Sequence, residues 1–386
     1  MFTISLTCLQ CGTTHPMTPT AYICPACEHG TTGMDTGILD VQYDYSALQD
    51  ALLRGQEINS SRSDVFRYLP LLPVEKPANV PHAGGTPLLS APRLASRLGL
   101  KALYIKDETR NPTRCLKDRA TVIAMTMALE NGVKDFYCAS AGNAAISLAS
   151  FCGHQGLECH VFVPREASQT RLNWLRRFGA DIRVSTGNYD QAFDEAEMAG
   201  AKHGWYSRNC AYNPFLVEGK KTVAFEIGEQ LGWHVPDLVV SPVGDGCTLG
   251  AIGKGFRELS LMGLTERLPR LLGVQAEAIQ PLVRRYHGQS TTSDEGTTDA
   301  ASMAVRRPRN ALRLLRELRA SEGAMLAVSD QQIASAQKLL AEEAGVIAEF
   351  TSSATLAGLI QHAEAESVAD KTAILVITGG RLDSDF

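Results

Sequence analysis

The sequence lacks the features that mark membrane, secreted and nucleic-acid-binding proteins. No stretch of its 386 residues approaches the roughly 20 consecutive apolar residues of a membrane-spanning helix. Lys and Arg number 37 against 42 Asp and Glu, the formal net charge is -5, and no long basic run occurs. Neither nucleic acid nor an anionic membrane is therefore expected as a partner. The first residues lack the basic-then-apolar layout of a signal peptide, so a cytoplasmic location is expected.

Four of the ten cysteines form one pattern. Ten are too few for a disulfide scaffold in a chain of this length. Cys8-x-x-Cys11 and Cys24-x-x-Cys27 offer two pairs of thiolates, and four sulfurs satisfy tetrahedral Zn²⁺ without leaving an open position. The pattern predicts a structural zinc ribbon over residues 1–45, with two coincidental pairs of buried or redox thiols as the alternative. Nucleic-acid binding by this ribbon is disfavoured because it contains no Lys or Arg.

The rest of the chain alternates between apolar runs of strand length and segments of helical periodicity. With 44% hydrophobic and 20% charged residues, it has enough apolar content for two or three domains. The alternation predicts α/β architecture with mainly parallel sheets. Residues 46–80 are expected to form helix and linker, and residues 288–302, rich in Ser, Thr, Asp and Gly, a surface loop. The strand-like runs lie at 102–106, 135–139, 158–163, 181–185, 237–243, 271–276 and 373–378.

A lysine at the head of a helix carries the main chemical prediction. Lys117 follows Asn111-Pro112-Thr113 and is followed by Asp118-Arg119 and an apolar helix. A lysine taken at random is usually a solvated surface charge. A lysine held at this place can instead be desolvated, which lowers its pKa toward the neutral amine that attacks an aldehyde. Together with the two turns described next, Lys117 predicts a pyridoxal phosphate site in which it forms the Schiff base.

A glycine-rich turn follows the apolar strand 237–243 and opens a helix near Leu249. Backbone N–H groups of such a turn, added to the helix dipole, bind a phosphate without a cation. A dinucleotide fingerprint is the alternative, but the spacing is G-x-G-x-x-x-G and no acidic residue ends a strand about 20 residues later. The predicted phosphate cup consists of Gly244, Asp245, Gly246, Cys247 and Thr248.

Two further polar positions follow strands. The turn 140–143 starts an apolar helix, whose N–H groups can bind a substrate carboxylate while the Asn143 amide reaches the phenolic oxygen of the cofactor. A helix N-cap is a simpler role for this turn, and both can hold. Thr378 follows another apolar strand, and its hydroxyl can bind the pyridine nitrogen, which favours elimination or replacement over transamination. A threonine that merely ends a strand is the alternative.

At these residues the chain resembles the threonine synthase family of fold-type II pyridoxal phosphate enzymes. Serine/threonine dehydratases, cysteate synthase and diaminopropionate ammonia-lyase belong to this family or lie close to it. The resemblance covers nearly the whole chain and includes Gly85-Thr86-Pro87-Leu88, Asn213-Pro214 and Glu218-Gly219-Lys220-Lys221-Thr222. It implies that Lys117 forms the Schiff base and shuttles protons, that Asn143 contacts the ring oxygen, and that Thr378 contacts the ring nitrogen.

The resemblance also implies an architecture and an assembly. The expected fold is tryptophan synthase β-like, with two open parallel-sheet domains and the N-terminal zinc ribbon. A homodimer is expected. The implied parts are the ribbon at 1–45, a large cofactor-binding domain at 46–108 and 210–386, and a small mobile domain at 109–209.

Three positions depart from the family pattern. True threonine synthases resemble one another in having a threonine after the turn asparagine, a serine before Asn-Pro and an arginine after it, which hold the phosphate of O-phosphohomoserine. Here these positions are Ala144, Ala211 and Leu216. A charged contact is worth about 1.5–3 kcal/mol and a neutral hydrogen bond roughly 1 kcal/mol. O-phosphohomoserine is therefore expected to be a poor substrate.

The lysine motif and the predicted phosphate cup also differ from the family pattern. Arg114-Cys115-Leu116 stands where the family usually has Gly-Ser-Phe, and Arg114 either meets a substrate side chain or lies on the surface. Asp245 would repel a phosphate, so it is expected to face away while the backbone of the turn binds. The candidate substrate-binding residues are Ser140, Ala141, Asn143, Ala144 and Arg114.

The expected activity is that of a threonine synthase-like lyase, which eliminates or replaces a β- or γ-substituent of an amino acid with Lys117 as the base. One alternative is an authentic threonine synthase that holds the substrate phosphate with Arg114, Arg171 or Arg208. A serine/threonine dehydratase or an ammonia-lyase is another. A catalytically inactive regulatory paralogue is the non-enzymatic alternative, and the pyridoxal phosphate motifs argue against it.

Overall fold

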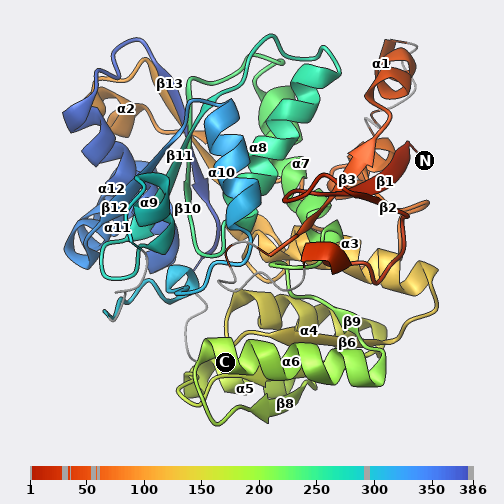
Figure 1. Ribbon diagram of the computed structural model, residues 1–386. Coiled ribbons are helices and arrows are strands. Elements are labelled where there is room, and N and C mark those ends of the chain that lie inside the picture. Colours follow the sequence, from red (N-terminus) through yellow and green to blue (C-terminus); the bar gives the residue numbers. More distant parts are fainter. Residues whose placement is uncertain are drawn as a thin grey trace.

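The computed structural model describes residues 2–27, 34, 36–53, 58, 61–290 and 296–380. Three sheets organise this part of the chain: a three-stranded sheet at the N-terminus, a six-stranded sheet and a four-stranded sheet (Figure 1). All strand pairs of the two larger sheets are parallel except that of β4 with β5. The predicted α/β class with two parallel-sheet units is confirmed.

The N-terminal sheet has the order β2-β1-β3 and is antiparallel. Its strands are β1 (Thr3–Cys8), β2 (Thr14–His15) and β3 (Leu39–Tyr43), and a 3-10 turn, η1 (Pro25–Cys27), lies between the last two. Gly37, two residues before β3, lies so close to the cysteines that a Cβ on it would lie 2.3 Å from Cβ of Cys27. Only glycine permits this approach, so Gly37 is part of the wall of the cysteine cluster.

The six-stranded sheet has the order β12-β11-β10-β13-β5-β4. Its strands are almost continuously apolar because helices cover both faces. Val239 of β10 packs into the core shared with α7, α8 and α10, whereas Val240 packs into the core shared with α11 and α12. The strands are β4 (Leu88–Ser90), β5 (Ala102–Asp107), β10 (Leu238–Pro242), β11 (Arg270–Ala276), β12 (Ala324–Val328) and β13 (Thr372–Ile377).

Helices enclose this sheet on its two sides (Figure 1). On one side lie α2 (Pro92–Leu98), α11 (Asp330–Ala344) and α12 (Phe350–Ala365). On the other lie α7 (Phe215–Gln230), α8 (Cys247–Leu261) and α10 (Ala311–Ala320), and α3 (Lys117–Glu130) packs against α7. The remaining elements are α1 (Tyr45–Leu53), η2 (Val65–Leu71), η3 (Glu108–Arg110), α9 (Pro281–Tyr286) and η4 (Ala301–Met303). Within the described ranges, no helix combines the length and apolar character that crossing a membrane requires.

The four-stranded sheet has the order β8-β7-β6-β9 and forms the lower part of Figure 1. Phe193 of α6 packs against Tyr137 and Phe162 on one face of the sheet. On the other face, α4 and α5 share the larger core. The strands are β6 (Asp135–Ala139), β7 (Glu158–Val163), β8 (Asp181–Val184) and β9 (Tyr206–Ser207), and the helices are α4 (Asn143–Gln155), α5 (Gln169–Arg177) and α6 (Tyr189–His203).

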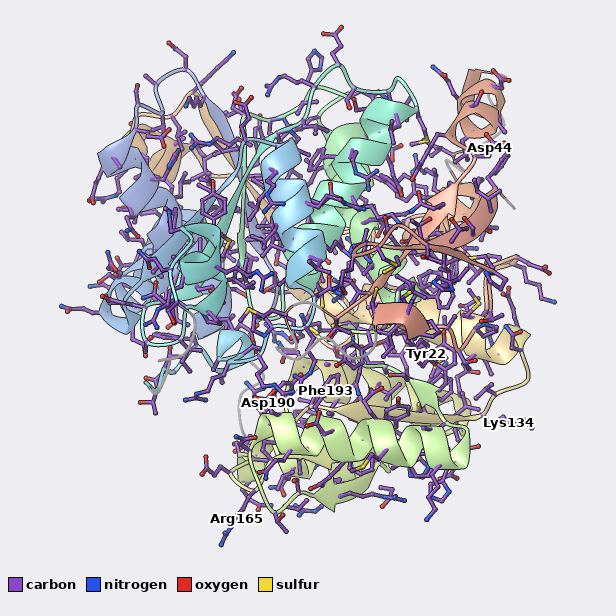
Figure 2. The ribbon with its side chains drawn as sticks, in the orientation of Figure 1. Tyr22, Asp44, Lys134, Arg165, Asp190 and Phe193 are labelled. Carbon is purple, nitrogen blue, oxygen red and sulfur yellow. The ribbon has the colours of Figure 1, made fainter. Side chains whose placement is uncertain are left out.

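The N-terminal sheet is tied to both larger units. Lys254 Nζ on α8 lies 2.8 Å from Asp40 Oδ1 on β3 and 2.7 Å from Glu218 Oε1, and all three side chains are buried. On the other side, the backbone N–H of Ser207 in β9 donates to the hydroxyl of Tyr22 at 3.1 Å, and Tyr22 lies between the two parts in Figure 2. The cysteine-containing segment is therefore an integral part of the fold.

Each of the seven apolar runs predicted as a strand is a strand. The short strands β4 and β9 were not predicted, because two or three residues leave no periodic pattern, and the five-residue strand β12 was missed as well. Among the described residues of the predicted surface loop at 288–302, all are exposed or half-buried except Ala300, which is completely buried. Residues 291–295 lie outside the described residues.

Candidate active site

A cavity of about 410 Å³ lies at the carboxyl ends of β6, β10 and β13, between the two larger sheets. Open parallel sheets bind ligands at this edge because turns there present backbone N–H groups and polar side chains. The cavity unites segments from residue 117 to residue 378. Except for Arg114, the predicted cofactor and substrate residues line it: Lys117, Ser140, Ala141, Asn143, Ala144, Gly244, Asp245, Gly246, Cys247, Thr248 and Thr378.

Lys117 is the first residue of α3 and lines the cavity. The backbone holds it beside Thr378, because Leu116 N donates to the carbonyl of Thr378 at 2.9 Å. Burial lowers the pKa of Lys117 below its ordinary value, and the nearby charges of Lys220 and Arg208 lower it further. The amine is thus biased toward its neutral, nucleophilic form, as the sequence predicts for this position.

The turn 140–143 leads from β6 into α4 and is held by its own hydrogen bond, from Gly142 N to Ser140 Oγ at 3.0 Å. A Cβ at Gly142 would lie 2.6 Å from Nη1 of Arg171, so glycine lets this guanidinium approach the turn. Asn143 begins α4, and its Nδ2 donates to both carboxylate oxygens of Glu349, at 3.1 and 2.9 Å. The unpaired N–H groups of this helix start can bind an anion.

Glu349 is a cavity residue that sequence reasoning missed. It precedes α12, where a glutamate is ordinarily a surface residue that interacts with the helix N-terminus. Here burial raises the pKa of Glu349, although the hydrogen bond from Asn143 and the charges of Arg171 and Lys117 oppose this shift. Glu349 is brought to Asn143 because Ala348 pairs with Gly380, two residues after Thr378. No local pattern in the sequence announces this contact.

The cup 244–248 connects β10 to α8. Gly246 has φ 95°, in the left-handed region that favours glycine, and a Cβ there would lie 3.1 Å from the carbonyl oxygen of Asn310. The sequence predicts that the side chain of Asp245 faces away from the phosphate. The residue lines the cavity, and its Oδ1 is turned to the segment before α10, where it accepts a hydrogen bond from the backbone N–H of Arg309 at 3.3 Å. Burial raises the pKa of Asp245 to about 6, so the carboxyl group is still mostly ionised at pH 7.

Arg309 also connects the cup to α6. Its Nη1 lies 2.9 Å from Asp190 Oδ1, and its guanidinium carbon lies 4.0 Å from the ring centre of Phe193. Figure 2 shows Asp190 and Phe193 on the side of α6 that faces the six-stranded unit. The segment before α10 therefore links the phosphate cup to the unit built on the four-stranded sheet.

Thr378 Oγ1 lies 3.0 Å from Ser352 Oγ at the start of α12. Ser352 Oγ in turn accepts from Gly379 N at 2.9 Å. This small network orients the Thr378 hydroxyl at the end of β13, where it lines the cavity. The network depends on Ser352, which the sequence did not single out.

Two predicted substrate contacts need correction. Arg114 does not line the cavity: it has φ 59°, its side chain is exposed, and its carbonyl accepts from Gly380 N at 3.0 Å, so the left-handed turn directs it outward. Leu216 does not line the cavity either, since it is fully buried in the main hydrophobic core. Of the three positions that depart from the family, only Ala144 and Ala211 face the cavity.

Two of the arginines considered as alternative cations do line the cavity, Arg171 and Arg208. Arg208 is 1% exposed, and its Nη2 donates to the carbonyl of Lys117 at 3.0 Å. Its Nη1 is buried and has no hydrogen-bond partner in the described part of the chain. A buried guanidinium N–H without a partner is costly, so this group is suited to an anionic ligand.

The four N-terminal cysteines come together as the pattern predicts. The sulfur atoms of Cys8, Cys11, Cys24 and Cys27 all lie within 4.8 Å of one another. Cys8 and Cys27 are 3.9 Å apart and Cys11 and Cys24 are 3.8 Å apart. Four sulfurs about 2.3 Å from a tetrahedral Zn²⁺ are separated by roughly 3.8 Å. The geometry of the cluster fits zinc.

Comparison with known proteins gives one family and one fold. The family model described as pyridoxal-phosphate dependent enzyme matches residues 80–379. Threonine synthase of Methanocaldococcus jannaschii is 35% identical over 379 residues, which cover 97% of this chain and 91% of that protein. Threonine synthase of Methanosarcina acetivorans is 34% identical and covers 98% and 92%.

Solved structures share the fold at low identity. Diaminopropionate ammonia lyase from Escherichia coli has a TM-score of 0.68 at 19% identity, covering 84% of this chain and 90% of that one. Processed threonine deaminase isoform 2 from Solanum lycopersicum has a TM-score of 0.66 at 22% identity, covering 77% and 80%. These likenesses support the architecture alone.

Proposed function

Because the chain belongs to the pyridoxal-phosphate dependent enzyme family, and within it to the threonine synthase family, we propose that it eliminates or replaces a substituent at the β- or γ-carbon of an amino acid. The observation that carries the proposal is the position of Lys117, whose pKa is lowered by burial at the cavity shared with the cup and the turn 140–143. A lysine in that setting acts as nucleophile and base.

The residues present fit pyridoxal phosphate. A glycine turn at the start of α8 suits its phosphate, the Thr378 hydroxyl suits its ring nitrogen, and the unpartnered Nη1 of Arg208 requires an anion near Lys117. When bound, the cofactor stabilises negative charge on the substrate α-carbon. In the proposed reaction Lys117 takes the α-proton and returns it, the start of α4 orients the substrate carboxylate, and Glu349 positions Asn143.

The distal part of the cavity bears on the substrate. Ala144 and Ala211 present methyl groups where threonine synthases resemble one another in having hydroxyls, which supports a substrate other than O-phosphohomoserine. The second candidate is threonine synthase itself. Two observations favour it: Arg171 and Arg208 supply cations to the cavity, and the relatives at 34–35% identity are named threonine synthase.

A panel of amino acids separates these candidates. Serine, threonine, diaminopropionate, O-acetylserine, O-phosphoserine and O-phosphohomoserine are each mixed with the holoenzyme, and keto acid, phosphate and threonine are measured. Turnover of any member without threonine formation supports the first candidate. Threonine production from O-phosphohomoserine near the median enzyme rate of about 10 per second establishes the second. Absence of turnover and of any spectral change with the entire panel would refute both.

Further proposals concern the rest of the molecule. The four cysteines bind a structural Zn²⁺, since they form a closed site without an open position.

The unit around the four-stranded sheet, within 109–209, moves as a small domain that closes over the substrate. In the closed form Arg309 joins this unit to the cup. A homodimer in the cytoplasm is the proposed working form. Size-exclusion chromatography with light scattering tests the dimer.

A further inference from the structure

Lys220 is a buried lysine without a partner. Its side chain is 0% exposed, and its Nζ has no hydrogen-bond acceptor among the described residues. The next residue, Lys221, is equally buried and its Nζ also lacks a well-aligned hydrogen bond to any described residue, but it forms ion pairs with Glu218 Oε2 at 2.5 Å and Glu258 Oε2 at 2.7 Å. Burying an ammonium group without an anion is strongly unfavourable. The surroundings of Lys220 are therefore incomplete without an anionic group, whereas those of Lys221 are complete.

The position of Lys220 identifies where that anion belongs. Lys220 lies in the second turn of α7, and α7 packs between α3 and α8. Helix α3 begins at Lys117, and α8 begins at Cys247 in the cup. Lys220 is not one of the residues that line the cavity, but its positive charge lowers the pKa of both Lys117 and Cys247, so its ammonium lies close behind the cavity wall near these two residues.

Two groups near Lys220 can carry negative charge, and neither forms a hydrogen bond to it. Asp245 accepts from the backbone of Arg309, and burial raises its pKa to about 6. Cys210 lines the cavity, and the pKa of its thiol is lowered first by a hydrogen bond with Cys247 and then by Lys220. The N-terminal N–H groups of α8 add further positive potential at the same place. A phosphate dianion has the charge that Lys220 and the N–H groups of α8 lack.

We propose that Lys220 is the cation that binds the phosphate monoester held in the cup 244–248. The inference rests on the proposed function, because the phosphate is that of the cofactor. Lys220 compensates for the acidic side chain of Asp245 in the cup, which would otherwise oppose a dianion. The residue thereby makes the site selective for the phosphorylated cofactor over pyridoxal. Inorganic phosphate shares this chemistry and serves as a second probe.

The test compares binding of pyridoxal phosphate and of pyridoxal to the apoenzyme, followed by absorbance. Lys220→Met should weaken pyridoxal phosphate binding by about 10- to 100-fold, as expected for a lost charged contact, and leave pyridoxal binding unchanged. Inorganic phosphate should raise the thermal midpoint of the wild-type apoenzyme and not that of the variant. Without ligand, Lys220→Met should melt at or above the wild-type temperature, because a buried unpaired charge has been removed.

Lys221→Met is the matched control. It removes the same charge one residue along the helix, and it should lower the apoenzyme midpoint without altering the ratio of the two affinities, because Glu218 and Glu258 lose their partner. Cys210→Ser tests whether the Cys210 thiol, rather than a phosphate, is the counter-ion of Lys220. This variant should leave the ratio of the pyridoxal phosphate and pyridoxal affinities unaltered. Lys220→Arg should restore part of the selectivity. Lys220→Gln replaces the methionine variant if that one does not fold.

Equal weakening of both ligands in Lys220→Met would show that Lys220 acts through Lys117 and would overturn the inference. Unchanged affinity for both would overturn it as well, and so would a lost affinity ratio in Cys210→Ser. These measurements involve no turnover. If Lys220→Met changes the ratio of the two affinities while the wild-type enzyme is inactive on every amino acid of the panel, the inference about Lys220 holds and the proposed function is refuted.

Discussion

Replacing Glu349 by glutamine tests two effects of this residue separately: its contribution to activity and its effect on the stability of the folded protein. Both carboxylate oxygens of Glu349 accept from Nδ2 of Asn143, at 3.1 and 2.9 Å. Glutamine has the same length but offers one accepting oxygen and one N–H group, so it keeps at most one of these contacts and loses the charge. The substitution therefore loosens Asn143 at the start of α4 without opening a cavity.

The expected loss of activity follows from the lost charge-assisted contact. A hydrogen bond to a charged group contributes about 1.5–3 kcal/mol, so kcat should fall by roughly 10- to 100-fold if the bond orients Asn143 in the transition state. Cofactor content should not change, because within the described part of the chain the Glu349 carboxylate accepts from Asn143 and from no residue of the cup.

The expected effect on stability has the opposite sign. Burial raises the pKa of Glu349 in the folded protein above that of an unfolded chain, about 4.3. Between these two pKa values the folded state binds more protons, so stability falls as pH rises through this window. Above the folded pKa, the ionised carboxylate lowers stability in full. Glu349→Gln removes this dependence, so at pH 8 the variant should melt at or above the wild-type temperature.

The assay combines turnover with thermal unfolding between pH 4 and pH 8. Glu342→Gln is the control, because Glu342 is an exposed residue on the neighbouring helix α11 and should affect neither quantity. Wild-type turnover in Glu349→Gln would refute the positioning role. A lower midpoint than wild type at pH 8 would show that the ionised carboxylate stabilises the fold, which contradicts the raised pKa.

Three other predictions test the site and the ribbon. Lys117→Ala should abolish covalent attachment of the cofactor, seen in its visible absorbance, and turnover, while the protein stays folded; full activity would remove the central proposal. Cys24→Ser should lower zinc content and the thermal midpoint with less effect on the chemical step, and an unchanged midpoint in a metal-free protein would contradict a structural zinc. Ala144→Thr with Ala211→Ser should lower KM for O-phosphohomoserine by about 30-fold if two hydroxyls each contribute about 1 kcal/mol. Adding Leu216→Arg should lower the midpoint because Leu216 is buried in the core, and a further gain in affinity at unchanged stability would show that this position faces the substrate.

Local patterns account for what could be predicted. Strands at the centre of parallel sheets are apolar on both faces, so runs such as 237–243 and 373–378 are visible in the sequence. The cysteine cluster could be predicted because each Cys-x-x-Cys pair forms a short turn that places its two thiols close to each other. Lys117 stands out because a lysine after Asn-Pro-Thr at the start of an apolar helix is an uncommon local arrangement.

The sequence by itself thus determined the α/β class, the cysteine cluster, the lysine at the start of α3 and the two turns at the starts of α4 and α8, because backbone geometry and short-range spacing decide these features. Only the tertiary structure decided which side chains meet in the cavity. Glu349 reaches Asn143 across 206 positions of the chain, and Lys220 is left unpaired while Lys221 finds two glutamates. Such pairing depends on how α7, α8 and α12 pack against one another. Burial in that packing then shifts the pKa of each group, and the neighbouring residues in the sequence do not reveal how deeply a group is buried.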